Sequence, residues 1–154
     1  MKLNIGDTAP SFNTFDSDKQ ALNSESLKGQ KILLLFFPAA FTSTCTEELC
    51  ALRDDIARYN TLKVKIIGCS TDSVYVLKKY KEEQELNFTL MADFNKEICA
   101  AFGSQYETFN YGMKGVAMRS AFIIDENNII QYAEVLEDSG KIPDFEAINA
   151  KLKK

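Results

Sequence analysis

An apolar run in the first third of the chain ends abruptly at a proline. Residues 32–37 read ILLLFF, and Pro38 follows them directly. A short run that is apolar at every position is typical of a strand buried on both faces, as in a parallel sheet. Proline has no N–H group to donate to a neighbouring strand, so it ends such a strand. The sequence therefore predicts a strand over residues 31–37 and a loop beyond its carboxyl end.

Helices and strands alternate after this first strand. Apolar residues at helical spacing in TEELCALRDDIARY predict a helix to about Tyr59, and VKIIGCS predicts a second buried strand that ends near Ser70. Strand, helix and strand in this order imply a right-handed parallel crossover. Further along, the sequence predicts a helix capped by Asp72 or Ser73, a strand in FTLMAD and a helix over residues 95–102. A loop follows over residues 103–118. After it we expect an antiparallel hairpin of RSAFIID and IIQYAEVL, and a last helix opened by Pro143.

These elements together predict an α/β fold of the thioredoxin-like class. The expected architecture is a central mixed sheet flanked by helices, with an N-terminal extension of short strands or a hairpin up to about residue 29. The chain has 154 residues, 45% of them hydrophobic, which is enough to bury one sizeable core. No repeat or linker interrupts it, so we expect residues 1–154 to form a single domain.

Composition argues against several classes of function. The net charge is −4 and basic residues do not cluster, which disfavours nucleic acid or an anionic membrane as a partner. The chain has no histidine, which excludes Cys-His and Ser-His-Asp catalysis and histidine-ligated metals. Its four cysteines form no C-x-x-C pair, so we expect no metal and no cofactor. The absence of a signal-peptide pattern and of a membrane-length apolar run favours a cytoplasmic location with reduced thiols.

Cys45 lies where a reactive thiol is expected. It follows the loop after Pro38 and falls in the first turn of the predicted helix, where unpaired N–H groups and the helix dipole favour a thiolate. A free cysteine is more often a small buried hydrophobe. The surrounding segment TSTCT is rich in hydroxyl groups rather than apolar side chains, however. The sequence therefore favours a nucleophilic role for Cys45.

Pro38, Thr42 and Cys45 match the P-x-x-x-T-x-x-C signature of the peroxiredoxins, and the chain resembles this family of alkyl hydroperoxide reductases and thiol-specific antioxidants. Cys50 and the LRDD after it resemble the peroxiredoxin Q, or bacterioferritin comigratory protein, subfamily. The C-terminal run that starts at YGMKGVAMRSAFIID is more similar to the one-cysteine, AhpE-like peroxiredoxins. With IGDTAPSF and LNFTLMAD, the resemblance covers nearly the whole chain.

The resemblance implies a thiol peroxidase in which Cys45 attacks the peroxide. The Thr42 hydroxyl would bind the thiolate and the peroxide, and Pro38 would shape the loop and shield the thiolate from water. Arg119 would stabilise the thiolate and the reacting oxygens with a charge that it cannot lose. Glu48, on the same helical face as Cys45, would orient Arg119. The alternatives are a surface arginine at a strand start and a surface carboxylate favoured by the helix dipole.

A second thiol must capture the sulfenic acid that this attack leaves on Cys45. Cys50 is the candidate. Residues five apart on one intact helix have Cα atoms about 8–9 Å from each other, beyond the roughly 7 Å limit for a disulfide. We therefore predict that the helix unwinds between residue 42 and about residue 52 during turnover, and that both thiols are free in the reduced protein. Cys50 could instead be a core residue, as we expect of Cys69, whereas Cys99 either packs in the core or resolves Cys45 in its place.

The expected substrates are hydrogen peroxide and alkyl hydroperoxides. Thioredoxin is the expected reductant of a Cys45–Cys50 disulfide, whereas a one-cysteine cycle would use a small thiol or a glutaredoxin-type donor. The peroxiredoxin Q resemblance favours a monomer, and the AhpE-like resemblance favours a homodimer that packs near the active-site loops. Four aromatic residues could line that contact or an apolar pocket for alkyl peroxides, although burial in an ordinary loop is the simpler interpretation: Phe41, Tyr106, Phe109 and Tyr111.

Two other classes of function are compatible with the same fold. One is a thiol–disulfide oxidoreductase, which the lack of a C-x-x-C motif disfavours. The other is a catalytically silent interaction domain, in which Cys45 would be dispensable.

Overall fold

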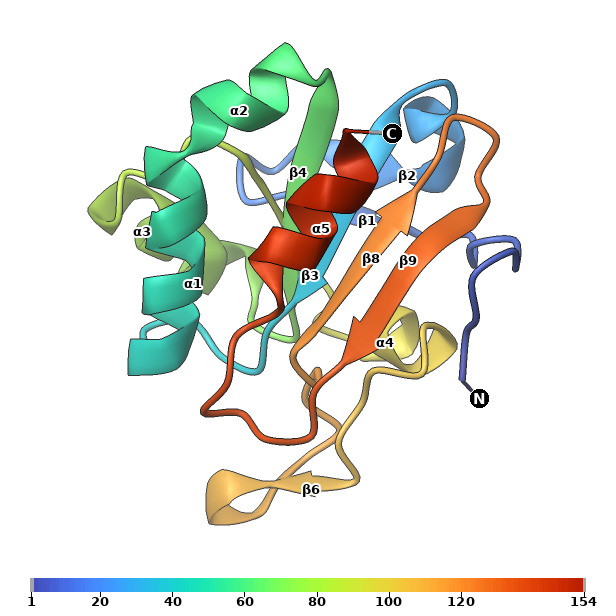
Figure 1. Ribbon diagram of the computed structural model, residues 1–154. Coiled ribbons are helices and arrows are strands. Elements are labelled where there is room, and N and C mark those ends of the chain that lie inside the picture. Colours follow the sequence, from blue (N-terminus) through green and yellow to red (C-terminus); the bar gives the residue numbers. More distant parts are fainter. Residues whose placement is uncertain (1, 154) are drawn as a thin grey trace.

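The computed structural model describes residues 2–153 and contains a central five-stranded mixed sheet (Figure 1). The strand order is β5-β4-β3-β8-β9. The strands are β3 (Lys31–Phe36), β4 (Val64–Ser70), β5 (Thr89–Ala92), β8 (Ser120–Ile124) and β9 (Ile130–Val135). The first three are parallel, whereas β8 runs antiparallel to β3 and β9 antiparallel to β8. The α/β, thioredoxin-like fold that the sequence predicts is confirmed.

Helices cover both faces of the sheet. They are α1 (Ser43–Asp54), α2 (Ile56–Thr61), α3 (Val74–Glu83), α4 (Glu97–Ala101) and α5 (Phe145–Leu152). Buried residues of α1, α2, α3 and α5 share one hydrophobic cluster on one face, and those of α4 join a second cluster on the other. Figure 1 shows the same division, with α5 crossing in front of the sheet and α4 behind it.

Strand β3 contributes side chains to both clusters, which explains why its sequence is apolar at every position after Lys31. Successive side chains of a strand point to opposite faces. Leu33 and Leu35 accordingly belong to the cluster under α1 and α5, and Leu34 and Phe36 belong to the other. All four are 1% exposed or less. The buried central strand predicted before Pro38 is therefore confirmed.

The N-terminal extension is a hairpin, as predicted. Strands β1 (Asn13–Phe15) and β2 (Ala21–Asn23) pair antiparallel, and a short 3₁₀ helix (Ser24–Leu27) follows them. Beyond β1, Asp16 forms an isolated bridge with Met91, and Ser17 N donates to Leu90 O at 2.9 Å. The extension therefore pairs with part of β5, which would otherwise be an open edge of the sheet.

Some predicted boundaries are wrong. The helix after Cys45 does not run unbroken to Tyr59 but ends at Asp54, and Asp55 leaves the helical conformation with φ −108° and ψ 18°. The carboxylate of Asp55 accepts a hydrogen bond from the side chain of Arg58 at 2.8 Å but makes no cap hydrogen bond to the backbone. Ser73, one of the two residues predicted, caps α3. The last helix begins later than expected, because Asp144, after Pro143, caps α5.

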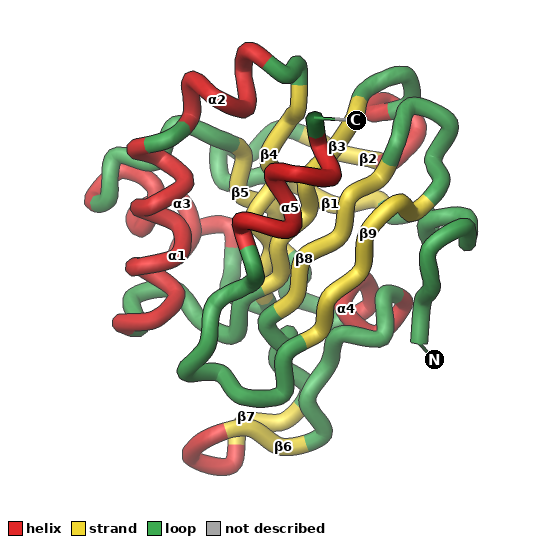
Figure 2. The backbone as a smooth tube through the Cα atoms, viewed as in Figure 1, coloured by secondary structure: helices red, strands yellow, loops and turns green. Residues whose placement is uncertain are grey.

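The predicted loop over residues 103–118 contains a small hairpin instead. Strands β6 (Thr108–Phe109) and β7 (Met113–Lys114) pair antiparallel around a short 3₁₀ turn, and Figure 2 shows this hairpin projecting beyond the sheet. Its strands are only two residues long, which is too short to produce a recognisable alternating pattern. Over residues 2–153, no helix is long and apolar enough to cross a bilayer.

Candidate active site

The carboxyl end of β3 brings together the predicted site residues. Pro38 follows the strand, and α1 starts after Thr42, so Cys45 is the third residue of the helix. Arg119 immediately precedes β8, whose first residue, Ser120, pairs with Phe36 at the end of β3. Two segments that are distant in the sequence therefore meet at one edge of the sheet.

The thiol of Cys45 is in direct contact with the guanidinium of Arg119. Arg119 Nη2 donates to Cys45 Sγ at 3.1 Å. Cys45 is only 1% exposed and belongs to the hydrophobic cluster beneath α1. The hydroxyl-rich sequence around it had argued against an apolar packing site, so the structure corrects that expectation. The Cys45 thiol is therefore both buried and in contact with the cationic side chain of Arg119.

Glu48 and Arg119 form a buried ion pair. Arg119 Nη1 donates to Glu48 Oε1 at 2.6 Å, and the two side chains are 1% and 0% exposed. Arg119 Nη2 also donates to the carbonyl oxygen of Ser139 at 3.2 Å. The alternative that these are surface residues is therefore wrong. The ion pair holds the guanidinium in one orientation, with Nη2 directed at the thiol of Cys45.

Burial and charge act in opposite directions on this pair. Burial raises the pKa of Glu48 to about 7, although the charge and the hydrogen bond of Arg119 act to lower it. Burial alone would lower the pKa of Arg119, but the charges of Glu48 and Cys45 outweigh burial and raise it. The guanidinium therefore keeps its positive charge beside the thiol.

Thr42 and Pro38 border the cavity that leads to the thiol. Pro38 is buried, whereas Thr42 is exposed. Among the described residues, the Thr42 hydroxyl donates to the carbonyl oxygen of Ala39 at 2.9 Å and not to Cys45, so the expected bond to the thiol is not formed. Both residues nevertheless line a cavity of about 210 Å³ whose walls also include Cys45 and Arg119.

The other wall of this cavity comes from the β6–β7 hairpin. Phe109, Tyr111 and Met113 line it. Tyr111 is 99% exposed and Phe41 is 49% exposed, and the other two loop aromatics are only half-buried, so the prediction that these four residues are simply buried is wrong. Tyr106 does not line the cavity but packs on Phe109, with ring centroids 4.8 Å apart. The thiol therefore lies at the base of a cavity with an apolar outer wall.

The chain has known relatives. The model of the AhpC/TSA family matches residues 5–133. The chain belongs to this peroxiredoxin family. It is 34% identical over 131 residues to peroxiredoxin Bcp of Escherichia coli, and the match covers 84% of each chain. The peroxiredoxin is accordingly a thiol-dependent peroxidase, an oxidoreductase, which confirms the coarse function that the sequence predicts.

Solved structures agree with this assignment. A cysteine-to-serine variant of Xylella fastidiosa PrxQ matches with a TM-score of 0.87 and 25% identity, over 99% of this chain and 97% of that one. BcpB of Mycobacterium tuberculosis matches with a TM-score of 0.84 over 98% and 97% of the two chains; at 24% identity, this likeness concerns the fold.

All four cysteines of the peroxiredoxin are free. Cys50 is half-buried, packs against the cluster beneath α1 and donates its thiol hydrogen to Gln84 Oε1 at 3.6 Å. Because α1 is continuous from residue 43 to residue 54, Cys45 and Cys50 lie on one intact helix. Free thiols at both positions agree with the expectation for the reduced protein.

The other two cysteines are core residues, as predicted for Cys69 and favoured for Cys99. Both are 0% exposed, and burial raises the pKa of each thiol, that of Cys99 to about 12. The carboxylate of Asp93 raises both values further. A thiol with so high a pKa forms little thiolate, so neither is suited to attack a sulfenic acid.

The active-site loop has an anchor that sequence reasoning missed. Asp72 Oδ2 accepts hydrogen bonds from Ala40 N at 2.8 Å and from Ser70 Oγ at 2.7 Å. These bonds connect the loop after β3 to the carboxyl end of β4. From the sequence, Asp72 is only a candidate helix cap. Its position just after β4, the strand next to β3, nevertheless indicates that it lies near the loop that carries Pro38.

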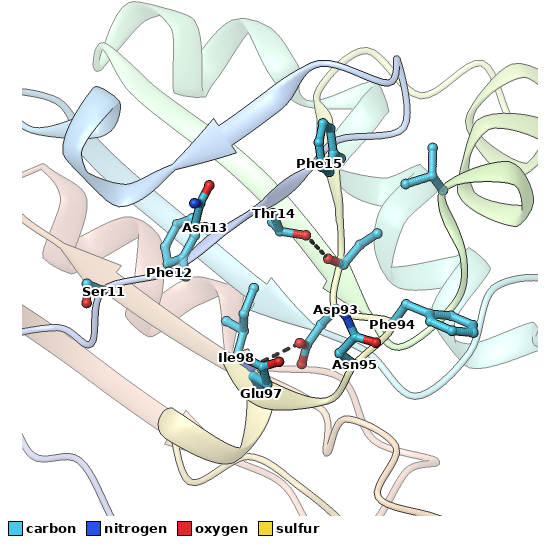
Figure 3. Close-up of a pocket in the computed structure, with 12 residues that line it drawn as sticks. Ser11, Phe12, Asn13, Thr14, Phe15, Asp93, Phe94, Asn95, Glu97 and Ile98 are labelled. Carbon is cyan, nitrogen blue, oxygen red and sulfur yellow. Dashed lines mark hydrogen bonds between the residues drawn. The ribbon is translucent and has the colours of Figure 1, made fainter.

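A second cavity, of about 230 Å³, lies away from the thiol between β1 and the segment after β5 (Figure 3). Phe12 and Phe94 are among the residues that line it. Its buried carboxylate, Asp93, accepts hydrogen bonds from Ile98 N at 2.9 Å and Cys99 N at 2.7 Å. Asp93 therefore binds the free backbone N–H groups at the start of α4. Within residues 2–153, no group of three His, Cys, Asp or Glu side chains is placed to hold a metal ion.

Proposed function

We propose that the peroxiredoxin reduces hydrogen peroxide and organic hydroperoxides at Cys45. The observation that carries this assignment is the 3.1 Å contact between Arg119 Nη2 and Cys45 Sγ at the base of a cavity. A thiolate is the nucleophilic form of cysteine, and a fixed positive charge at hydrogen-bond distance favours it. The first turn of α1 adds unpaired backbone N–H groups around the same sulfur.

In the proposed reaction, the Cys45 thiolate attacks one oxygen of the peroxide. An S–O bond forms as the O–O bond breaks, which leaves a sulfenic acid on Cys45 and an alkoxide or hydroxide that takes up a proton. Arg119 donates to the oxygens that gain charge, and it cannot lose its own proton to them. Glu48 keeps the guanidinium in place through the 2.6 Å bond. Thr42 lines the cavity, and we expect its hydroxyl to turn from Ala39 towards the bound peroxide.

The apolar wall of the cavity supports organic hydroperoxides as substrates. Phe109, Tyr111 and Met113 offer contacts to an alkyl or aryl group, while the polar end of the cavity receives the peroxide. Pro38, which also lines the cavity, would shield the thiolate from water. We expect hydrogen peroxide to react at the same thiol without using the hairpin wall.

Cys50 is the proposed resolving thiol. Its thiolate would attack Cys45 Sγ, forming a disulfide and releasing the sulfenic oxygen as water after protonation. The intact α1 holds the two cysteines too far apart, so its first turns must unwind before the bond can close. Thioredoxin would then reduce the disulfide by thiol–disulfide exchange, which returns both thiols.

A one-cysteine cycle is the second candidate, and a specific observation favours it. The Cys50 thiol is half-buried and engaged with Gln84, so the resting structure offers no free second thiol beside Cys45. In that cycle an external thiol would reduce the sulfenic acid directly.

The peroxiredoxin could be a monomer or a homodimer, and both stay predictions. Small-angle scattering of the reduced protein would distinguish the two.

Intact-mass spectrometry after one equivalent of hydrogen peroxide, with a sulfenic-acid trap present, tests these assignments. We expect the wild type to lose two hydrogens as the disulfide closes, and Cys50→Ser to accumulate trapped sulfenate at Cys45. Trapped sulfenate in the wild type would instead favour the one-cysteine cycle. Cys45→Ser is the control, and peroxide consumption by this variant would contradict the role of Cys45.

A further inference from the structure

Side-chain hydrogen bonds connect α1 to α3 and to Gln84, the residue that caps the end of α3, along the segment that carries both cysteines. Thr46 Oγ1 and Tyr80 Oη lie 2.9 Å apart at the start of α1. Cys50 Sγ donates to Gln84 Oε1 at 3.6 Å in the middle of the helix. Arg53 Nη1 donates to the carbonyl oxygen of Gln84 at 2.6 Å near its end. Unwinding of α1 must break the first two bonds.

We propose that Tyr80 and Gln84 are positioning residues that hold α1 in its wound form and thereby set the rate at which the Cys45–Cys50 disulfide closes. This inference rests on the proposed role of Cys50 as the resolving thiol. It assigns to α3, which carries neither cysteine, control over the second step of the reaction and not over the first.

Tyr80 is placed to act on the start of α1. Its side chain is 0% exposed, and its ring packs against those of Phe37 and Phe41, with centroids 6.3 and 4.9 Å away. Burial raises the pKa of Tyr80 to about 12, and the charges of Cys45 and Cys50 add to this increase. The hydroxyl is therefore neutral. Because the ring is fixed by the core, the Thr46 bond holds the helix to a rigid partner.

Gln84 acts on the resolving thiol itself. Its side-chain oxygen accepts the thiol hydrogen of Cys50 at 3.6 Å, so this bond must break before Cys50 can reach Cys45. Gln84 therefore holds Cys50 in its place on the wound helix, distant from Cys45, until α1 moves.

Two reactions compete for the sulfenic acid of Cys45. In one, the Cys50 thiolate displaces the sulfenic oxygen, and the products are a disulfide and water. In the other, the sulfenate attacks a second peroxide ROOH, and the products are a sulfinate on Cys45 and the alcohol ROH, an oxidation that few systems reverse. Slower unwinding of α1 favours the second reaction, so Tyr80 and Gln84 also determine how much peroxide inactivates the enzyme.

Quenched-flow mass spectrometry of the full chain separates the two steps. Tyr80→Phe removes the hydroxyl and keeps the buried ring, and Tyr75→Phe is the matched control, because Tyr75 lies on the same helix with its side chain 74% exposed. We expect Tyr80→Phe to form sulfenate at the wild-type rate and to close the disulfide about 2- to 10-fold faster, as the loss of one hydrogen bond implies. Its sulfinate yield in excess peroxide should fall by a similar factor, and Tyr75→Phe should behave as wild type.

Thr46→Val and the double variant Thr46→Val/Tyr80→Phe show whether the shared hydrogen bond is responsible. We expect the double variant to be no faster than either single variant, because both changes remove the same bond. Gln84→Ala should accelerate closure independently. If the wild type forms a disulfide and these variants close it at the wild-type rate, the positioning role is overturned while the role of Cys50 stands. A wild type that forms no disulfide overturns both.

Discussion

Replacing Arg119 with methionine tests the buried ion pair. The change leaves the fully buried carboxylate of Glu48 without its partner and also removes the hydrogen bonds to Cys45 Sγ and Ser139 O. Removal of one member of a buried pair lowers the free energy of unfolding by about 3–5 kcal/mol. We expect a loss in this range, together with a fall in peroxidase kcat/KM of about 100- to 1000-fold, as for the loss of a charge-stabilising donor.

The stability loss should depend on pH in a defined direction. Burial already raises the pKa of Glu48 to about 7, above the 4.5 of an unperturbed glutamate, and removal of Arg119 raises it further. Glu48 of the variant then stays protonated above pH 7 while the unfolded chain ionises, so the folded state continues to lose stability as the pH rises. The deficit against wild type should therefore be constant at mildly acid pH and widen above neutrality by up to about 1.4 kcal/mol per pH unit.

Urea denaturation of the reduced proteins, followed by far-ultraviolet circular dichroism because the chain has no tryptophan, measures this deficit. The matched control is Arg119→Met/Glu48→Leu, which replaces the pair with apolar side chains of similar volume. We expect it to recover most of the free energy of unfolding and to lose the pH dependence, but not to recover peroxidase activity. A double variant as unstable as Arg119→Met, or full peroxidase activity in Arg119→Met, would refute this reasoning.

Three further changes have defined outcomes. Gly68→Ala places a Cβ atom 2.9 Å from Leu90 Cδ2 in the packed core, and chemical denaturation should show a loss of about 1–3 kcal/mol; an unchanged midpoint would contradict the packing argument. Asp72→Ala removes the acceptor of Ala40 N–H, and kcat/KM for peroxide should fall about 10-fold because the loop is no longer held, whereas wild-type kinetics would show that the anchor is dispensable. Cys99, whose thiol pKa burial raises to about 12, should resist alkylation at mildly alkaline pH until the protein is unfolded, as peptide mass spectrometry would show; rapid labelling of the native protein would disprove its inertness.

The parts of the fold that sequence alone predicts are those with a strong local pattern. The side chains of the apolar runs in β3 and β4 can all leave water only if both faces of each strand are buried. Their place in a parallel sheet follows directly. The position of Cys45 also follows, because Pro38 ends the strand and the helical pattern starts a few residues later. The β6–β7 hairpin, by contrast, depends on two residue pairs and a turn, which leave no period to detect.

The contacts within the site are less predictable than its members. Nothing local to Glu48 or Arg119 shows that both are buried, since their burial depends on each other and on the pairing of β8 with β3. Tyr80 is a similar case, because its helical pattern predicts a core residue but not a hydroxyl contact with Thr46 on another helix. Such contacts connect segments that are far apart in the sequence, and a pattern within one segment carries no information about them.

The bond between Arg119 and Cys45 joins residues 74 positions apart, and this separation has a consequence during synthesis of the chain. When the ribosome has produced Cys45, the arginine that we propose activates it does not yet exist, and the two meet only after β8 has paired with β3. Until then the thiol lacks the guanidinium and should react slowly with peroxide. We therefore expect nascent and partly unfolded chains to undergo less irreversible oxidation at Cys45, and fast reaction with peroxide to require a fully assembled sheet.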